Sequence, residues 1–208
     1  EHEEIPSFGF TPDADFPAIY GEKGILMVRL SMEASKSGFV KISGGEAPNM
    51  VADWAKGTLA DGTVLAEKGR AAHGSTPEEG ENAISKLMEK AADFDCPFAK
   101  FYMEKIGWCL DGSNIGIGLC DEASGTLTFN AGRIGLTDDR LFLEADIRYP
   151  VTYSEEEVLD RMEKAVSSHG VKINVITSMD PVYMDKDGEV IKKLMSAYKE
   201  VTGDETQP

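Results

Sequence analysis

The stretch Leu141-Phe142-Leu143-Glu144-Ala145-Asp146-Ile147-Arg148-Tyr149-Pro150 decides the fold class of this chain. Apolar and polar residues alternate along it. One face of the segment carries Leu141, Leu143, Ala145 and Ile147, and the other carries Phe142, Glu144, Asp146 and Arg148. Such alternation is typical of a β-strand that buries one of its two faces. The pattern therefore predicts a sheet with one face packed against a core.

Strands of the same kind are predicted on both sides of this segment. The alternation recurs at residues 26–33, 39–43, 127–129 and 171–175. A turn is expected at Asn130-Ala131-Gly132, because these residue types favour turns. Residues 49–55 fit either an extended segment or a short helix.

Helices are predicted where apolar residues recur at helical spacing. The expected ranges are 77–92, 97–108, 155–169 and 187–201. In the first, Thr76 is the expected N-cap, Pro77 the first helical residue and Glu79 the capping-box partner. Ser154 is the expected N-cap of the third helix, with Glu157 as its partner.

The order of these elements predicts an α+β fold, in which an antiparallel β-sheet is covered on one face by helices in a ferredoxin-like sandwich. We expect this domain to span residues 24–180. Residues 1–23 contain three prolines and little periodicity, so they predict loop and short edge segments. Residues 181–208 contain a helix followed by a turn-like ending, which is typical of a chain cut from a longer one.

Composition excludes several classes of partner. The 208 residues include 21 Lys and Arg against 37 Asp and Glu, a formal net charge of −16, which argues against a nucleic-acid or acidic membrane surface. The sequence lacks an apolar run near the ~20 residues needed to cross a bilayer, and its acidic start is unlike a signal peptide. Cys96, Cys109 and Cys120 lack a CxxC spacing, which predicts free thiols and a cytoplasmic location.

Four residues are candidates for chemistry, and each also has a structural explanation. His73 precedes a capped helix and can present its imidazole outward, but it also fits an ordinary polar corner. Arg148 ends the cleanest strand and suits capture of a carboxylate, or a structural ion pair with Asp146 or Glu144. Asn49 fits a turn or a ligand contact, and Asp13 fits a metal ligand or a solvated acidic loop.

Four segments together resemble the PepV-like zinc dipeptidases, of the aminoacylase/carboxypeptidase-type metallopeptidase family. They are Gly9 to Pro17 with Gly21-Glu22-Lys23-Gly24, Gly44 to Asp53, Ala72-His73-Gly74-Ser75 with Gly80-Glu81-Asn82-Ala83, and Asp146-Ile147-Arg148-Tyr149-Pro150. They spread over nearly the whole chain. In that family a lid domain interrupts the catalytic domain. The resemblance implies that residues 24–180 are a lid/dimerisation-type domain and that residues 1–23 and 181–208 are remnants of the catalytic domain.

The resemblance also implies roles for the four candidates. Asp13 matches a zinc ligand, and His73 matches a lid histidine that stabilises the oxyanion developing on the scissile carbonyl. Asn49 and Arg148 match residues that hold the peptide, with the arginine on its free carboxylate. The implied cofactor is zinc, two ions in the full-length enzyme, and the implied partners are a short peptide substrate and the rest of the catalytic domain.

The sequence also departs from the family pattern. The His-x-Asp ligands, the bridging aspartate, the Glu-Glu pair and the late histidine have no counterpart, so the isolated chain is expected to be an inactive fragment. The interval from Trp54 to Arg70 is shorter than expected. Two alternatives stay open: a non-catalytic dimerisation module, and the lid of an N-acyl amino acid amidohydrolase or carboxypeptidase.

Overall fold

The computed structural model describes residues 16–137 and 139–208. The described chain divides into two compact units. The larger comprises Lys23–Pro181, and the smaller combines residues 16–22 with Val182–Pro208. Asp13 lies outside the described residues, as does most of the segment predicted to be loop at the start of the chain.

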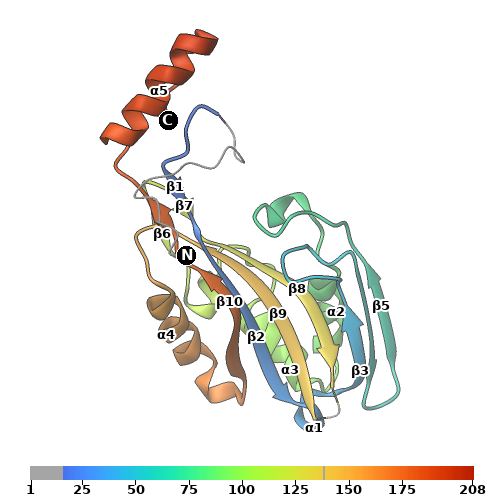
Figure 1. Cartoon of the computed structure of the whole chain (residues 1–208). Coiled ribbons are helices and arrows are strands. Elements are labelled where there is room, and N and C mark those ends of the chain that lie inside the picture. Colours follow the sequence, from blue (N-terminus) through green and yellow to red (C-terminus); the bar gives the residue numbers. More distant parts are fainter. Residues whose placement is uncertain (1–15, 138) are drawn as a thin grey trace, which may run out of the picture. The chain divides into compact units, whose positions relative to one another are not determined.

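A seven-stranded sheet, in the order β10-β2-β9-β8-β3-β4-β5, dominates the larger unit (Figure 1). Its strands are β2 (Gly24–Glu33), β3 (Phe39–Gly44), β4 (Trp54–Leu59), β5 (Val64–Lys68), β8 (Thr128–Leu136), β9 (Arg140–Tyr149) and β10 (Lys172–Met179). Each neighbouring pair is antiparallel. Strands β6 (Cys120–Asp121) and β7 (Gly125–Thr126) pair with each other as a separate two-stranded sheet.

Strand β9 confirms the alternation from which the fold class was predicted. It pairs with β2 from Tyr149 opposite Gly24 to Arg140 opposite Glu33, and with β8 on its other side. Leu141, Leu143, Ala145 and Ile147 are all completely buried. The apolar row of β2 is also buried, so two central strands form the floor of one continuous core.

Helices cover one face of the sheet, which confirms the α+β class (Figure 1). They are α1 (Ala34–Ser37), α2 (Ala83–Ala92), α3 (Pro97–Lys105) and α4 (Glu155–Val166). The apolar stripe of α2 includes Ile84, Leu87 and Met88, each with no exposed surface, and it belongs to the same core as the inward row of β9. Burying both an apolar helix stripe and an apolar sheet face accounts for this two-layer packing.

The helix predicted at residues 77–92 is two separate elements. Residues Pro77–Glu79 form a short 3₁₀ helix, η1, and α2 begins only at Ala83. The predicted N-cap was therefore wrong: Asn82 caps α2, with its Oδ1 accepting from the backbone N–H of Ile84 at 2.9 Å. Gly80 separates the two elements, and a Cβ there would lie 2.8 Å from Val51. Tertiary packing against this glycine overrides the local capping signal.

The turn predicted at Asn130-Ala131-Gly132 is also wrong, because β8 continues through it as a β-bulge. The register shifts between Ala131 and Arg133, which leaves Gly132 as the extra residue. A Cβ on Gly132 would lie 2.1 Å from the carbonyl oxygen of Pro48. Glycine here serves a close approach between two backbone segments rather than a change of chain direction.

The segment from Trp54 to Arg70, short by comparison with the family pattern, is a closed hairpin of β4 and β5. Trp54 pairs with Lys68 and Thr58 with Val64. The turn is secured by a 2.9 Å hydrogen bond from the Leu59 amide to the Thr63 carbonyl. Of the undecided segment 49–55, Met50 forms an isolated antiparallel bridge and residues from Trp54 onward join β4.

The later helices agree with the pattern apart from their ends. Ser154 caps α4, accepting from the Glu157 amide at 3.2 Å, as predicted. The helix then ends in a short 3₁₀ segment, η3 (Ser167–His169), before Gly170 at φ 65°. Helix α3 is shorter than the predicted 97–108 and ends at Lys105.

The smaller unit consists of a two-stranded ribbon and one helix. Strand β1 (Gly21–Glu22) pairs antiparallel with β11 (Val182–Tyr183). Helix α5 (Glu189–Thr202) begins two residues later than predicted and ends before Gly203, at φ 72°. Within this unit the ring of Phe16 stacks on that of Tyr198, with centroids 5.6 Å apart.

The central position of β9 gives a test of the core. We expect Leu143→Ala to lower the free energy of unfolding by about 2–5 kcal/mol, because Leu143 is fully buried and truncation leaves a cavity. Val64→Ala on the edge strand β5 is the control: Val64 is 59% exposed and its truncation should change stability by less than about 0.5 kcal/mol. Urea denaturation of both variants measures the difference, and similar losses would contradict this account of the core.

Candidate functional site

In a simple two-layer fold, the polar row of β9 would face open solvent. Here two of its residues are buried instead. Glu144 is only 3% exposed and Asp146 is completely buried. Glu144 lies between two arginines, accepting from Arg29 Nε at 3.1 Å and from Arg133 Nη1 at 3.2 Å. Asp146 is instead covered by backbone segments from elsewhere in the chain, and these build the candidate site.

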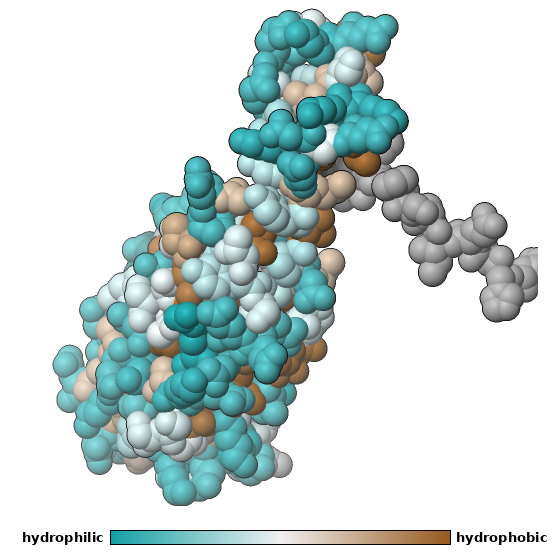
Figure 2. Space-filling view, turned by 90° about the vertical axis from the view of Figure 1, so that its left-hand side faces the viewer, coloured by the Kyte–Doolittle hydropathy of each residue, from teal (hydrophilic) through white to brown (hydrophobic). Residues whose placement is uncertain are grey.

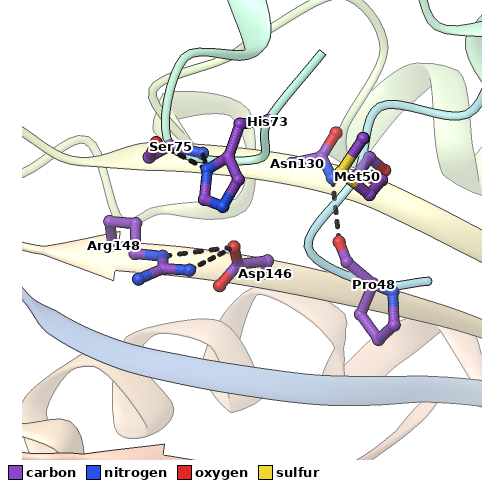
Figure 3. A network of polar contacts seen from close by, with 7 residues as sticks. All are labelled: Pro48, Met50, His73, Ser75, Asn130, Asp146 and Arg148. Carbon is purple, nitrogen blue, oxygen red and sulfur yellow. Dashed lines mark hydrogen bonds and ion pairs between the residues drawn. The ribbon is translucent and has the colours of Figure 1, made fainter. Parts of the chain in front are cut away.

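One covering segment, residues 48–50, is held down by Asn130. Asn130 lies opposite Asp146 in the register of β8 and β9, on the polar face. Its amide nitrogen donates to the carbonyl oxygens of Pro48 at 2.8 Å and Met50 at 2.9 Å (Figure 3). Because Asn130 is 1% exposed, these bonds form in a water-poor setting and strongly favour one position of the segment.

The second covering segment carries His73. Met50 and His73 form an antiparallel bridge, and the Gly74 amide donates to the Asn49 carbonyl at 2.8 Å. A Cβ on Gly74 would lie 2.8 Å from Asp146 Oδ2 and 2.9 Å from the Asn49 carbonyl oxygen. The missing side chain therefore lets the His73 segment lie directly against the buried carboxylate.

Arg148 and Asp146 form the centre of the site. Asp146 Oδ2 accepts from Arg148 Nε at 3.1 Å and from Arg148 Nη2 at 3.0 Å (Figure 3). Asp146 Oδ1 is buried and has no hydrogen-bond partner among the described residues. Burial raises the pKa of the Asp146 carboxyl above its ordinary value, and the positive charge of Arg148 opposes this shift.

The His73 imidazole is held by the residue two positions later. Its Nδ1 lies 2.7 Å from Ser75 Oγ and accepts from the Ser75 backbone N–H at 3.2 Å. The other ring nitrogen points toward the side on which Asp146 and Arg148 lie (Figure 3). His73 as a whole is exposed.

The structure thus brings together His73 and Arg148, which the sequence singled out separately. It places Asn49 in the turn beside them, where its carbonyl supports Gly74. The position of Arg148 is compatible with both a structural ion pair and capture of a carboxylate. Its Nε and Nη2 pair with Asp146, and its Nη1 is not used in that pair.

Sequence reasoning missed the site roles of Asn130 and Ser75, and it named Asp146 only as a possible ion-pair partner of Arg148 without its burial. Asp146 was placed on the polar face of its strand, but alternation cannot reveal that loops cover that face. Asn130 was assigned to a turn, whereas its amide anchors the segment at residues 48–50. For Ser75 a signal existed, since it lies two residues after a histidine, a spacing at which serine can bond locally.

A metal site is not formed by the described residues alone. Within residues 16–137 and 139–208, no group of three or more His, Cys, Asp or Glu side chains is placed to hold a metal ion. Asp13, the residue matched to a zinc ligand, lies outside this range. In the same described part, no helix has the length and apolar character to cross a membrane.

Comparison with known proteins places this geometry in context. A family model described as "Peptidase dimerisation domain", of M20 type, matches residues 57–174. A Staphylococcus epidermidis protein named "Putative dipeptidase" is 27% identical over 248 residues, covering 99% of this chain and 53% of the relative. A Staphylococcus aureus protein with a name of the same form matches with the same identity and coverage. The chain therefore spans about half the length of the curated relatives it matches.

Among solved structures, an aminoacylhistidine dipeptidase from Vibrio alginolyticus matches with a TM-score of 0.44 and 12% identity, covering 88% of this chain and 49% of that one. The alignment with the staphylococcal relatives has 248 positions, more than the 208 residues of this chain. The relatives therefore carry residues within the aligned region that this chain lacks.

Gly74 gives a first test of the site. We expect Gly74→Ala to lower the free energy of unfolding by about 1–3 kcal/mol, because the added methyl group would collide with Asp146 Oδ2 and the Asn49 carbonyl. The amide resonances of Asn49 and His73 should shift as the segment lifts. Unchanged stability together with unchanged resonances would show that Gly74 does not pack on Asp146.

The ion pair gives a second test, through pH. The folded pKa of Asp146 lies above its ordinary value of 3.8, so the folded state binds more protons between the two values and stability falls as pH rises through that window. Arg148→Met removes the opposing charge and raises the pKa further. Its free energy of unfolding should therefore fall over a wider pH range than that of the parent.

Urea denaturation between about pH 4 and pH 8 measures this difference. Arg161→Met is the matched control, because Arg161 pairs with Glu157 on the exposed face of α4 and lies away from Asp146 in the fold. Its pH profile should follow that of the parent. If Arg148→Met also follows the parent, Arg148 does not oppose the burial of Asp146.

Proposed function

Because this chain belongs to the M20-type peptidase dimerisation domain family, we propose that it is the lid portion of a zinc-dependent dipeptidase that hydrolyses short peptides. The observation that carries the proposal is the convergence of His73 and Arg148 on one carboxylate, Asp146, at the polar face of the sheet. The names of the staphylococcal relatives support the choice of dipeptides over other peptidase substrates.

His73 suits the stabilisation of an oxyanion. With Nδ1 occupied by Ser75, the other ring nitrogen is the one that can donate to a peptide carbonyl. Negative charge develops on that oxygen only as the carbonyl is attacked, so a donor held in place stabilises the transition state more than the bound substrate.

Arg148 suits the free carboxylate of a dipeptide. Asp146 takes up Nε and Nη2, and the N–H groups of Nη1 remain to donate. The ion pair also restricts the guanidinium to one position, which reduces the ordering that substrate binding would require. Asn49 is the third proposed substrate contact, from the turn that supports Gly74.

Zinc is part of the proposal through Asp13 and the family resemblance. Since the described residues form no metal site alone, further ligands would come from elsewhere in the complete enzyme, as would the general base. In this arrangement residues 1–23 and 181–208 belong to the catalytic domain and residues 24–180 to the lid. The metal when bound would supply activation of the attacking water.

We propose a cytoplasmic location because the cysteines are free thiols. Cys96, Cys109 and Cys120 are all free, and Cys96 is buried without a partner sulfur. Free cysteines are ordinary in a reducing compartment and uncommon in secreted proteins.

The proposal predicts the effect of removing the imidazole. In the complete enzyme, His73→Ala should lower kcat by at least ~100-fold, the scale of losing one oxyanion donor. His169→Ala is the matched control: His169 packs on Phe101 and contacts Glu104, away from the Asp146 cluster, and its loss should leave kcat near the parent value. Dipeptide hydrolysis assays measure both, and a near-normal rate for His73→Ala would remove His73 from the mechanism.

The isolated chain should not hydrolyse dipeptides, because most of the zinc ligands and the general base that the family requires have no counterpart in it. The measurement is an assay of the purified 208-residue chain with and without added zinc. Hydrolysis at a rate that depends on His73 would contradict the division of labour between lid and catalytic domain.

Dimerisation is a second candidate role, favoured by the description of the matching family. Strand β10 is an edge of the sheet, and its Val175, Ile176 and Met179 are 43%, 45% and 62% exposed. Viewed from the side of α4, apolar residues are scattered among hydrophilic ones on the larger unit (Figure 2). Size-exclusion chromatography with light scattering on the chain distinguishes the roles: a tight isolated dimer supports dimerisation.

A further inference from the structure

We propose that Ser75 is a positioning residue that holds His73 in the tautomer with its proton on Nε2, turned toward the reacting carbonyl. This inference rests on the proposed function for its purpose, but the tautomer itself can be measured without any activity. It concerns the two contacts that Ser75 makes with a single ring nitrogen.

The backbone contact decides the direction of the proton. The Ser75 N–H donates to His73 Nδ1 at 3.2 Å, and a backbone amide can only donate. Nδ1 must therefore offer its lone pair, so in the neutral imidazole the proton is on Nε2. The opposite tautomer would turn two N–H groups against each other.

The hydroxyl contact strengthens the same choice. Ser75 Oγ lies 2.7 Å from Nδ1, and a hydroxyl can act as donor or acceptor. Since the neighbouring amide makes Nδ1 an acceptor, the hydroxyl donates as well, and the two donors share the single lone pair of Nδ1. Both contacts come from Ser75, so they tie the Nδ1 edge of the ring to the chain two positions later.

The surroundings of the other ring nitrogen agree with a proton there. The Nε2 side of the ring turns toward Asp146 and Arg148 (Figure 3). His73 is close enough to Asp146 for charge on the imidazole to act on that carboxyl. Gly74 brings the two segments together, since its backbone lies against Asp146 Oδ2. A donor at Nε2 therefore faces a carboxylate at rest and is correctly polarised for an oxyanion.

The chain is well suited to a direct test, because it contains only three histidines. Nitrogen-15 correlation spectra of the histidine rings, recorded at about pH 8.5 where unperturbed imidazole is neutral, distinguish a protonated from an unprotonated ring nitrogen. In the parent we expect His73 to show an unprotonated Nδ1 and a protonated Nε2. A mixed population or a protonated Nδ1 would overturn the proposal.

Two substitutions separate positioning from folding. Ser75→Ala keeps the backbone N–H, which still favours the proton on Nε2, but removes the hydroxyl donor, so the Nδ1 and Nε2 resonances should move part of the way toward a tautomer average. Ser75→Thr keeps both donors and should restore the parent spectrum. The control resonances are those of His169, which should be the same in all three proteins. Identical His73 resonances in Ser75→Ala and the parent would overturn the role of the hydroxyl.

Kinetics on the complete enzyme then tests the purpose. Loss of one hydrogen bond to the imidazole should lower kcat roughly 2- to 12-fold with little change in KM, and Ser75→Thr should recover most of it. Failure of the proposed function would give a different result: the His73→Ala enzyme would retain activity, although the spectra of the parent protein still showed the Nε2 tautomer of His73. An unaltered kcat in Ser75→Ala, beside an inactive His73→Ala, would overturn the positioning role alone.

Discussion

Asp146 organises the candidate site from a position in which a carboxylate is costly to keep. It is completely buried on the polar face of the sheet, and one of its oxygens has no partner among the described residues. Burial without full hydrogen bonding disfavours the charged form, and pairing with Arg148 offsets only part of that cost. A buried ion pair is weak grounds for stability. Under the proposed function, this pair holds the guanidinium for the substrate carboxylate.

The sheet makes this arrangement possible by supplying rigid positions at known register. Asp146 and Asn130 lie opposite each other on β9 and β8, one binding Arg148 and the other the segment at residues 48–50. Gly132 and Gly74 then allow backbone to approach where any side chain would collide. The His73 segment thus lies near Arg148, although 75 positions of sequence separate the two residues. Contacts with the sheet and with residues 49–50 hold this segment in place.

The proposed lid role fits a domain that contributes donors but no complete reaction centre in its described part. An oxyanion donor and a carboxylate-binding arginine both act by position and charge, and both are held here by neighbours within the domain. The family match and the names of the relatives point to peptide hydrolysis, while the chain spans only about half of those relatives. The division of the chemistry between this domain and another is therefore a proposal about the complete enzyme.

The sequence by itself determined the α+β class, because alternation in β2 and β9 and the apolar stripe of α2 are local patterns that survive packing. It also singled out His73 and Arg148, partly through family resemblance. Only the tertiary structure decided that the two residues meet, that Asn130 lies in a continuous strand rather than a turn, and that Asn82 rather than Thr76 caps α2. Those features depend on contacts between distant segments, in which a glycine or a buried amide is selected by what packs against it, and local sequence carries no record of that neighbour.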